Sequence, residues 1–189
     1  MMVNARVELT ELERAAKNLK FELLRNAFYH GDELKFFLAL ERWTKLISAM
    51  LGIAVAGYGI AKNSFWGIFF GLGITFMQIG GLVFGWSGRT VLHEGKRQKY
   101  FYLLSELERQ PPTEELILHI QGEMTKIWAE EPAQKWGVEV MARNSAMMAM
   151  KSSSELKPGD IIPIYPWEKR VRNIFSFSPE YFRKRHRAA

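Results

Sequence analysis

Apolar and charged residues are sharply segregated along the chain. Between residues 46 and 88 the only charged side chain is that of Lys62 and there is no proline, whereas the segments before and after are rich in Lys, Arg, Asp and Glu. As α-helices, the uncharged runs 46–61 and 64–88 would extend about 24 Å and about 38 Å, against about 30 Å for the hydrocarbon core of a bilayer. The pattern therefore predicts a transmembrane helical hairpin over residues 44–88.

The two predicted spans lie at about 44–61 and 64–86. The first is marginal in length and needs its flanking lysines to reach the aqueous boundary with their long side chains. Trp43 stands at the start of the first span, and Trp66 and Trp86 bracket the second, about 30 Å apart along a helix. Because tryptophan is enriched at membrane–water interfaces, these three residues are predicted interface anchors.

Small residues along both spans predict how the helices pack. Only Lys62 and Asn63 join the spans, so the helices are expected to lie antiparallel, with Ser64 capping the second. Helices in lipid attract each other largely through close backbone approach at small side chains. The predicted seam comprises Gly52, Ala56 and Gly59 on the first span and Gly67, Gly71, Gln78, Gly81 and Gly85 on the second.

Gln78 is the only strongly polar side chain near the centre of the second span. Two interpretations remain open. The amide forms a hydrogen bond with the partner helix, a contact that stabilises membrane helices by about 0.6 kcal/mol on average. Alternatively, glutamines from several copies line or gate a pore in an oligomer.

Basic residues near the ends of the hairpin indicate its orientation. Arg42 and Lys45 precede the first span and Arg89 begins a basic stretch after the second, whereas the connection offers only Lys62. Positively charged residues favour the cytoplasmic side of a membrane. Both termini are therefore expected in the cytoplasm.

The segments on either side of the hairpin carry helical patterns. Residues 1–43 predict an amphipathic helix with a possible break at Gly31, and residues 89–150 predict further helices, one of them capped by Thr113. Residues 151–189 predict a linker and a basic, aromatic tail that is expected to lie on the membrane surface. The predicted fold is an all-α membrane protein with long cytoplasmic helical extensions.

Composition narrows the candidate chemistry. The chain has no cysteine, its net charge is +6, and it lacks a Ser/His/Asp grouping, a phosphate-binding glycine loop and paired metal-binding histidines. We therefore expect no enzymatic activity, no cofactor and no metal. The polar run His30–Glu33 is interpreted as a helix break with capping acids, with a metal or proton site as the alternative. A basic protein can bind nucleic acid, but no base-reading fold is indicated.

A stretch of about residues 15–110 resembles the SLATT family, the SMODS- and SLOG-associating two-transmembrane effector domains of bacterial conflict systems. The residues that carry the resemblance are Arg25, Ala27, Tyr29, His30, Phe37, Arg42 and Trp43, followed by the helix from Tyr100 to Glu108. Two further segments look like distant versions of a cytoplasmic continuation in relatives. They are the pair Glu131–Pro132 and the run 142–145. Arg25, Tyr29 and His30 form the membrane-proximal motif of this resemblance.

The resemblance implies an effector of antiviral defence that permeabilises the inner membrane when a linked sensor or nucleotide signal triggers it. Two helices per chain cannot enclose a channel, so a pore requires a homo-oligomer. The alternative is a non-conducting scaffold, in which the hairpin anchors a helical module that recruits a cytoplasmic partner. The expected partners are the lipid bilayer, further copies of the chain, and a sensor or nucleotide-signalling protein.

Overall fold

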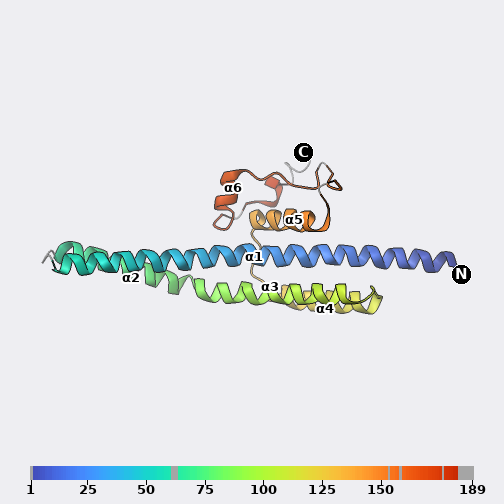
Figure 1. Cartoon of the computed structure of the whole chain (residues 1–189), viewed down its shortest axis with the longest axis horizontal. Helices are drawn as coiled ribbons and strands as arrows, with labels where there is room; N and C mark the ends of the chain where they lie inside the picture. The colour runs from blue at the N-terminus through green and yellow to red at the C-terminus, as the bar shows by residue number, and fades with distance from the viewer. Residues whose placement is uncertain (1, 61–63, 153, 158, 176, 183–189) are drawn as a thin grey trace. The chain divides into compact units, whose positions relative to one another are not determined.

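A computed structural model describes residues 2–60, 64–152, 154–157, 159–175 and 177–182. All regular secondary structure in these residues is helical, which confirms the all-α prediction (Figure 1). The helices are α1 (Met2–Ile60), α2 (Ser64–Val83), α3 (Trp86–Arg109), α4 (Glu114–Ala129), α5 (Trp136–Met150) and α6 (Pro166–Val171). The chain divides into two compact units, a polar unit (Met1–Glu33 and Glu94–Ala189) and an apolar unit (Leu34–His93).

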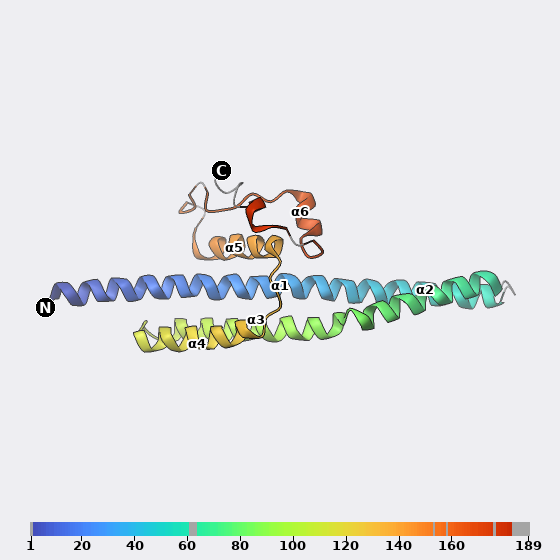
Figure 2. The same ribbon diagram turned by 180° about the vertical axis from the view of Figure 1, so that it is seen from behind.

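The polar unit is organised around the first half of α1. The leucines that repeat along this helix face α3 and α4 on one side, and Tyr29 faces α5 on the other (Figures 1 and 2). The main core comprises Leu19, Leu23, Leu24 and Ala27 of α1, Tyr100, Leu103, Leu104 and Leu107 of α3, Leu116, Ile117, Ile120, Met124 and Ile127 of α4, and Ala146 of α5.

Local signals define α4 as predicted. Two prolines precede it, and the hydroxyl of Thr113 accepts a hydrogen bond from the backbone nitrogen of Leu116 at 3.2 Å. Glu114 and Glu115 occupy the first turn, where the helix dipole favours negative charge. The predicted N-cap is confirmed.

The helix break expected at Gly31 is absent, because α1 continues through it. A glycine inside a helix costs about 1 kcal/mol relative to alanine, an amount that tertiary packing readily offsets. Gly31 is buried, and a carbon added to it would lie 3.5 Å from Nε of Arg97. An added carbon would make an ordinary van der Waals contact with this side chain, so the packing of Arg97 does not require a glycine here.

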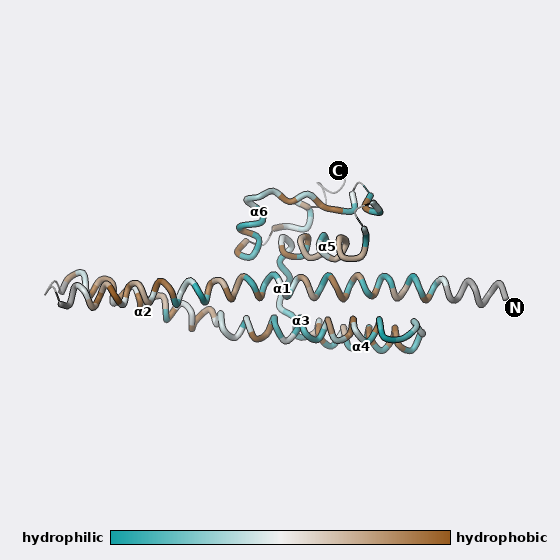
Figure 3. Tube along the Cα trace, viewed as in Figure 1, coloured by the Kyte–Doolittle hydropathy of each residue, from teal (hydrophilic) through white to brown (hydrophobic). Residues whose placement is uncertain are grey.

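The apolar unit pairs the second half of α1 with α2. Leu51 lies against Gly73, Ser48 against Gln78, and Phe37 against Arg89 and His93. Along these contacts the residue numbers increase on one side of the pair and decrease on the other. The two segments therefore run antiparallel. Figure 3 shows that the hydrophobic residues concentrate in this pair. The predicted connection Lys62–Asn63 and the side chain of Ser64 lie outside the described residues.

The second predicted span is shorter than expected. α2 ends at Val83, Phe84 and Gly85 form a turn, and Trp86 begins α3. Gly85 has a φ of 59°, the left-handed conformation that commonly ends a helix and that glycine adopts without strain. Trp66 and Trp86 therefore do not bracket one helix. By length and composition, the stretch Phe65–Arg109 is the one described stretch apolar enough to cross a membrane.

Replacement of a core residue tests the packing of the polar unit. We expect Ile120→Ala to lower the free energy of unfolding by about 2–5 kcal/mol, because it removes buried methyl groups and leaves a cavity. Leu118→Ala, two residues away on the exposed face of the same helix, is the matched control and should change it by less than about 0.5 kcal/mol. Denaturant unfolding in detergent, followed by circular dichroism, measures both. Equal effects would contradict the assigned core.

Candidate functional site

The most distinctive site in the polar unit is a buried cluster of polar side chains centred on Glu131. This carboxylate lies just after α4, and its side chain is 6% exposed. Its Oε1 atom accepts hydrogen bonds from Tyr100 OH at 2.7 Å and from His30 Nε2 at 2.9 Å. The rings of His30 and Tyr100 stack with centroids 5.6 Å apart. One carboxylate therefore joins α1, α3 and the end of α4.

A second carboxylate, Glu33, extends the cluster by one turn of α1. Its Oε2 atom pairs with Lys135 Nζ at 2.8 Å, and its Oε1 accepts from Asn173 Nδ2 at 2.9 Å. The backbone nitrogen of Lys135 also donates to the hydroxyl of Tyr29 at 3.1 Å. Glu33 is nearly inaccessible to solvent, so these partners supply the charge and hydrogen bonds that water otherwise provides.

An arginine–carboxylate pair occurs at each end of the cluster. Arg172 lies 3.2 Å from Asp32, and Arg25 Nε lies 3.0 Å from Glu139 while its terminal nitrogens reach Glu22. Some buried polar atoms at these two ends of the cluster lack a hydrogen bond. Among the described residues, the buried side-chain atoms that make no hydrogen bond are Asn26 Nδ2, Glu139 Oε2, Arg172 Nε and Arg25 Nε, the last of which keeps only its ion pair with Glu139. A buried polar atom without a hydrogen bond carries an uncompensated desolvation cost.

Burial and charge set the ionisation of the cluster in opposite directions. Burial favours the neutral form of Glu131, but the hydrogen bonds from His30 and Tyr100 and the nearby charges outweigh it and lower its pKa. Burial raises the pKa of Glu139, against the opposing effect of Arg25. Burial also raises the pKa of Tyr100, which stays neutral and donates its proton to Glu131. Glu131 is thus held as the anionic centre.

The membrane-proximal motif lies in this cluster. Arg25, Tyr29 and His30 all face it from α1, but they belong to the polar unit and stabilise its interior. The interpretation of His30–Glu33 as a helix break with capping acids is wrong, because these residues lie inside α1 and pair with segments far away in the sequence. Sequence reasoning missed Tyr100, Lys135 and Asn173 as partners, since nothing local distinguishes them.

The weakly resembling segments also have structural roles. Glu131 of the Glu131–Pro132 pair is the centre of the cluster. In the run 142–145, Asn144 Nδ2 donates to the carbonyl of Ile162 at 2.7 Å, and its Oδ1 accepts from the nitrogen of Ile162 at 3.0 Å. This pair of bonds fixes the extended segment after α5 to the helix. Asn144 thereby positions the C-terminal part of the polar unit.

The predicted glycine seam is not where the two helices of one chain meet. Among the described residues, no side chain or distant backbone atom lies within 4 Å of a carbon added at Gly52, Gly67, Gly71 or Gly85, whereas a carbon added at Gly73 would lie 3.5 Å from Leu51. Gly81 contacts Trp86 locally, Ala56 is exposed, and the surroundings of Gly59 lie outside the described residues.

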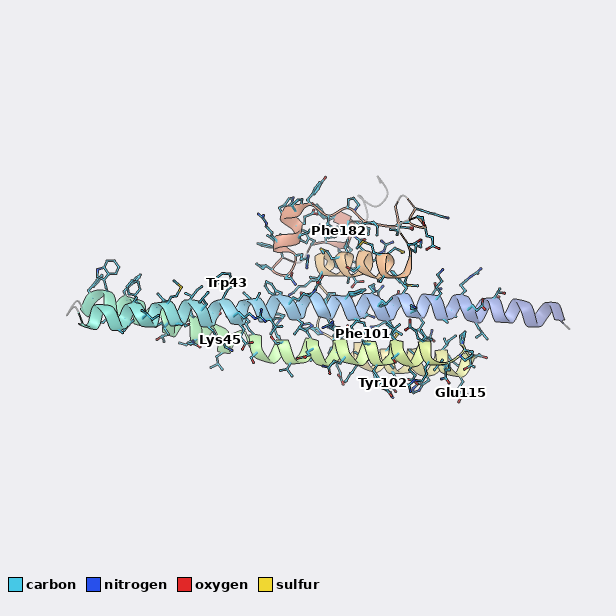
Figure 4. All side chains as sticks on the ribbon, in the orientation of Figure 1. Trp43, Lys45, Phe101, Tyr102, Glu115 and Phe182 are labelled. Carbon is cyan, nitrogen blue, oxygen red and sulfur yellow. The ribbon has the colours of Figure 1, made fainter. Side chains whose placement is uncertain are left out.

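The polar residue of the seam has a partner across the pair. Gln78 Nε2 donates to Ser48 Oγ at 3.2 Å. Of the predicted anchors, Trp43 projects away from α1 into open space, Trp66 is exposed and Trp86 is half-buried (Figure 4). None of the most apolar window of the stretch Phe65–Arg109 is buried within the structure.

The described residues contain no group of three or more His, Asp or Glu side chains placed to hold a metal ion. His119 lies 3.6 Å from Glu106, at the edge of an ion-pair distance, and both side chains are accessible. Comparisons with models of protein families, with curated proteins and with solved structures found no match. The function must therefore be inferred from the chain's own geometry.

The lowered pKa of Glu131 makes the stability of the polar unit sensitive to acid. Its folded pKa lies below the ordinary value of 4.5, so its contribution is complete above that value and is lost as the pH falls through the folded pKa. We expect Glu131→Gln to lower the free energy of unfolding by about 2–4 kcal/mol at pH 7. The difference from the wild type should shrink on acidification below pH 4.5.

Glu130→Gln is the matched control, because Glu130 is the neighbouring residue and is exposed. Its unfolding curves should stay close to those of the wild type at both pH values. Urea unfolding monitored by circular dichroism at neutral and acid pH makes the comparison. If the two variants behaved alike, Glu131 would not be the electrostatic centre of the cluster.

Proposed function

We propose that the chain is an oligomeric inner-membrane effector of a bacterial defence system, whose hairpins assemble into a pore and whose polar unit receives the trigger. The proposal is non-enzymatic. The observation that carries it is the polar pair Gln78–Ser48, which lies on an exposed face of an otherwise apolar helix pair. The steps that lead from this pair to a pore are physical, and the defence context comes from the resemblance to SLATT domains.

The outer surface of the helix pair supports membrane insertion. Phe76 and Leu82 of α2 are 75% and 83% exposed. Further exposed apolar side chains are those of Met50 and Ile53 on α1 and of Phe65, Ile68, Phe69, Leu72 and Ile79 on α2. An apolar surface of this extent is unfavourable in water and favourable in lipid. We infer that α2 and the end of α1 both span the bilayer, with both termini in the cytoplasm.

The polar pair supports assembly into an oligomer. A glutamine amide has two donors and one acceptor, so the bond to Ser48 leaves hydrogen-bonding capacity unused. Unsatisfied polar groups cost several kcal/mol in hydrocarbon, which disfavours a lipid-facing position. Either another copy or an aqueous path therefore faces Gln78. The open space at Gly67 and Gly71 permits a second copy to approach closely.

A link between trigger and pore is provided by α1, which contributes residues to both units. His30 and Glu33 belong to the incompletely satisfied polar cluster, and Ser48 belongs to the polar pair. A sensor or nucleotide-signalling partner that rearranges the cluster would act on the same helix that carries Ser48. This is the feature of the fold that favours a triggered effector.

A non-conducting scaffold is the second candidate. The observation in its favour is a pocket of about 800 Å³ on the surface of α3 and α4. Tyr102, Leu103, His119 and Ile127 are among the residues that line it, together with Lys and Glu side chains. Such a mixed surface suits a cytoplasmic protein partner. In this case the helix pair only anchors the polar unit to the membrane.

Removal of the amide tests the pore. We expect induced expression of the wild type to admit a membrane-impermeant dye and Gln78→Leu to abolish most of that entry, because leucine cannot replace the polar contacts of the pair. Thr75→Val is the matched control, since the Thr75 hydroxyl bonds to the Gly71 carbonyl of its own helix. Dye entry that is absent for the wild type under every trigger would favour the scaffold.

Thiol labelling tests the two spans. The chain lacks cysteine, so single cysteines are unique probes. In spheroplasts that carry each cysteine in the Gln78→Leu background, which is expected not to admit impermeant molecules, an impermeant thiol reagent should label Asn63→Cys. It should label Glu13→Cys and Leu118→Cys only after lysis. Phe76→Cys should resist labelling in both conditions, because it faces lipid. Labelling of Glu13→Cys from outside would indicate a single span and contradict the hairpin.

A further inference from the structure

We propose that the segment 165–175, hereafter the aromatic segment, binds anionic phospholipid on the surface of the membrane that the same chain enters. The proposal rests on the membrane insertion proposed above. It concerns residues other than the helix pair and other than the far C-terminal tail. The segment comprises α6 and the turns that follow it.

Bulky apolar side chains are concentrated on the outside of this segment. Trp167 is 53% exposed, Ile174 65% and Phe175 61%. Exposed apolar side chains also occur elsewhere in the polar unit, for example Tyr102 on α3 and Leu118 and Trp128 on α4. A short segment with tryptophan and phenylalanine on its surface is typical of proteins that insert into the interfacial layer of a bilayer.

The charge of the segment's surface is positive. Lys169 and Arg170 are exposed, whereas its one acidic residue, Glu168, is buried. Glu168 Oε2 accepts from the backbone nitrogen of Tyr165 at 2.7 Å, and its other oxygen accepts from the hydroxyl of Tyr181. The sequence adds a basic run at 183–187, outside the described residues. Cations beside exposed aromatic rings match an anionic lipid surface.

The aromatic segment cannot turn its apolar side chains inward, because the polar cluster fixes its backbone. Arg172 pairs with Asp32, and Asn173 donates to Glu33. Both bonds involve polar groups that are largely or fully buried. The residues next to them, Ile174 and Phe175, therefore remain outside.

The segment is also tethered close to the membrane along the chain. Its anchor on α1, Glu33, precedes Trp43 by roughly ten residues, a length of chain that spans at most about 36 Å in any conformation. Once the helix pair is inserted, Glu33 can therefore lie no farther than this length of chain from Trp43. This constraint favours lipid over a soluble protein as the occupant.

The prediction that the whole aromatic tail lies on the membrane surface is wrong for two of its rings. Phe182 is buried and packs with Val140 and Ile162, and Phe177 is partly buried against the same cluster. These two rings were expected on the membrane surface with the rest of the tail, but they form a small core. Phe175 remains exposed, together with Trp167 and Ile174 upstream.

Site-directed spin labelling of the full-length protein tests the proposal. Phe175→Cys is labelled with a nitroxide and the protein is reconstituted in vesicles of phosphatidylcholine alone or mixed with phosphatidylglycerol. In the mixed vesicles we expect the label to collide more with lipid-soluble oxygen than with a water-soluble nickel complex. The double substitution Lys169→Gln with Arg170→Gln should lower the equilibrium constant between docked and undocked segment about fivefold for each removed cation.

Two control labels make the outcomes separable. Phe76→Cys reports insertion of the helix pair, and Leu118→Cys reports a water-exposed site of the polar unit. A water-accessible label at 175 with a lipid-exposed label at 76 would overturn the aromatic segment alone, whereas a water-accessible label at 76 would overturn the proposed function. Spin–spin broadening at 175 would assign the segment to contacts between copies and overturn lipid binding. Equal docking without phosphatidylglycerol would overturn the role of anionic lipid.

Discussion

Carboxylates buried along α1 and beside it organise the polar unit. A charge removed from water is tolerated only when other groups replace its hydration, and Glu131 and Glu33 each recruit partners from distant segments for that purpose. Glu131 brings α3 and the end of α4 to His30, and Glu33 brings Lys135 and Asn173 to the next turn of α1. Without these two carboxylates, the apolar faces of the helices would still collapse, but His30, Lys135 and Asn173 would lose their charged partners.

The parts of the fold that depend on local or periodic signals were predictable. The leucine repeat identified the core face of α1, and Thr113 identified the start of α4. Hydropathy located the apolar stretch that α2 begins. Two local signals were misread, because glycine has more than one structural use. Gly31 lies inside a helix that continues past it, and Gly85 ends a helix through its left-handed backbone.

The site was predictable only from one side. The motif on α1 indicated Arg25, Tyr29 and His30. A single sequence does not show which distant residue pairs with a buried charge. Tyr100 looked like one more apolar position in a helical stripe, and Glu131 like the last acid before a proline. The glycine seam failed as a guide to packing within the chain for a related reason. Small residues permit close approach, but they do not specify the partner. In this pair Leu51 lies against Gly73, which is not a residue of the predicted seam.

The polar unit is built from two stretches of chain that are far apart in the sequence, and this affects its synthesis. Its first segment, which ends at Glu33, leaves the ribosome long before α3 and α4 exist to cover its leucines. At about 5–20 residues per second, the roughly 100 residues up to Glu131 take on the order of 5–20 seconds to appear. During that interval the nascent chain exposes both an apolar stripe and the hydrophobic hairpin. For the membrane insertion proposed above, targeting would therefore have to begin before the polar unit is complete.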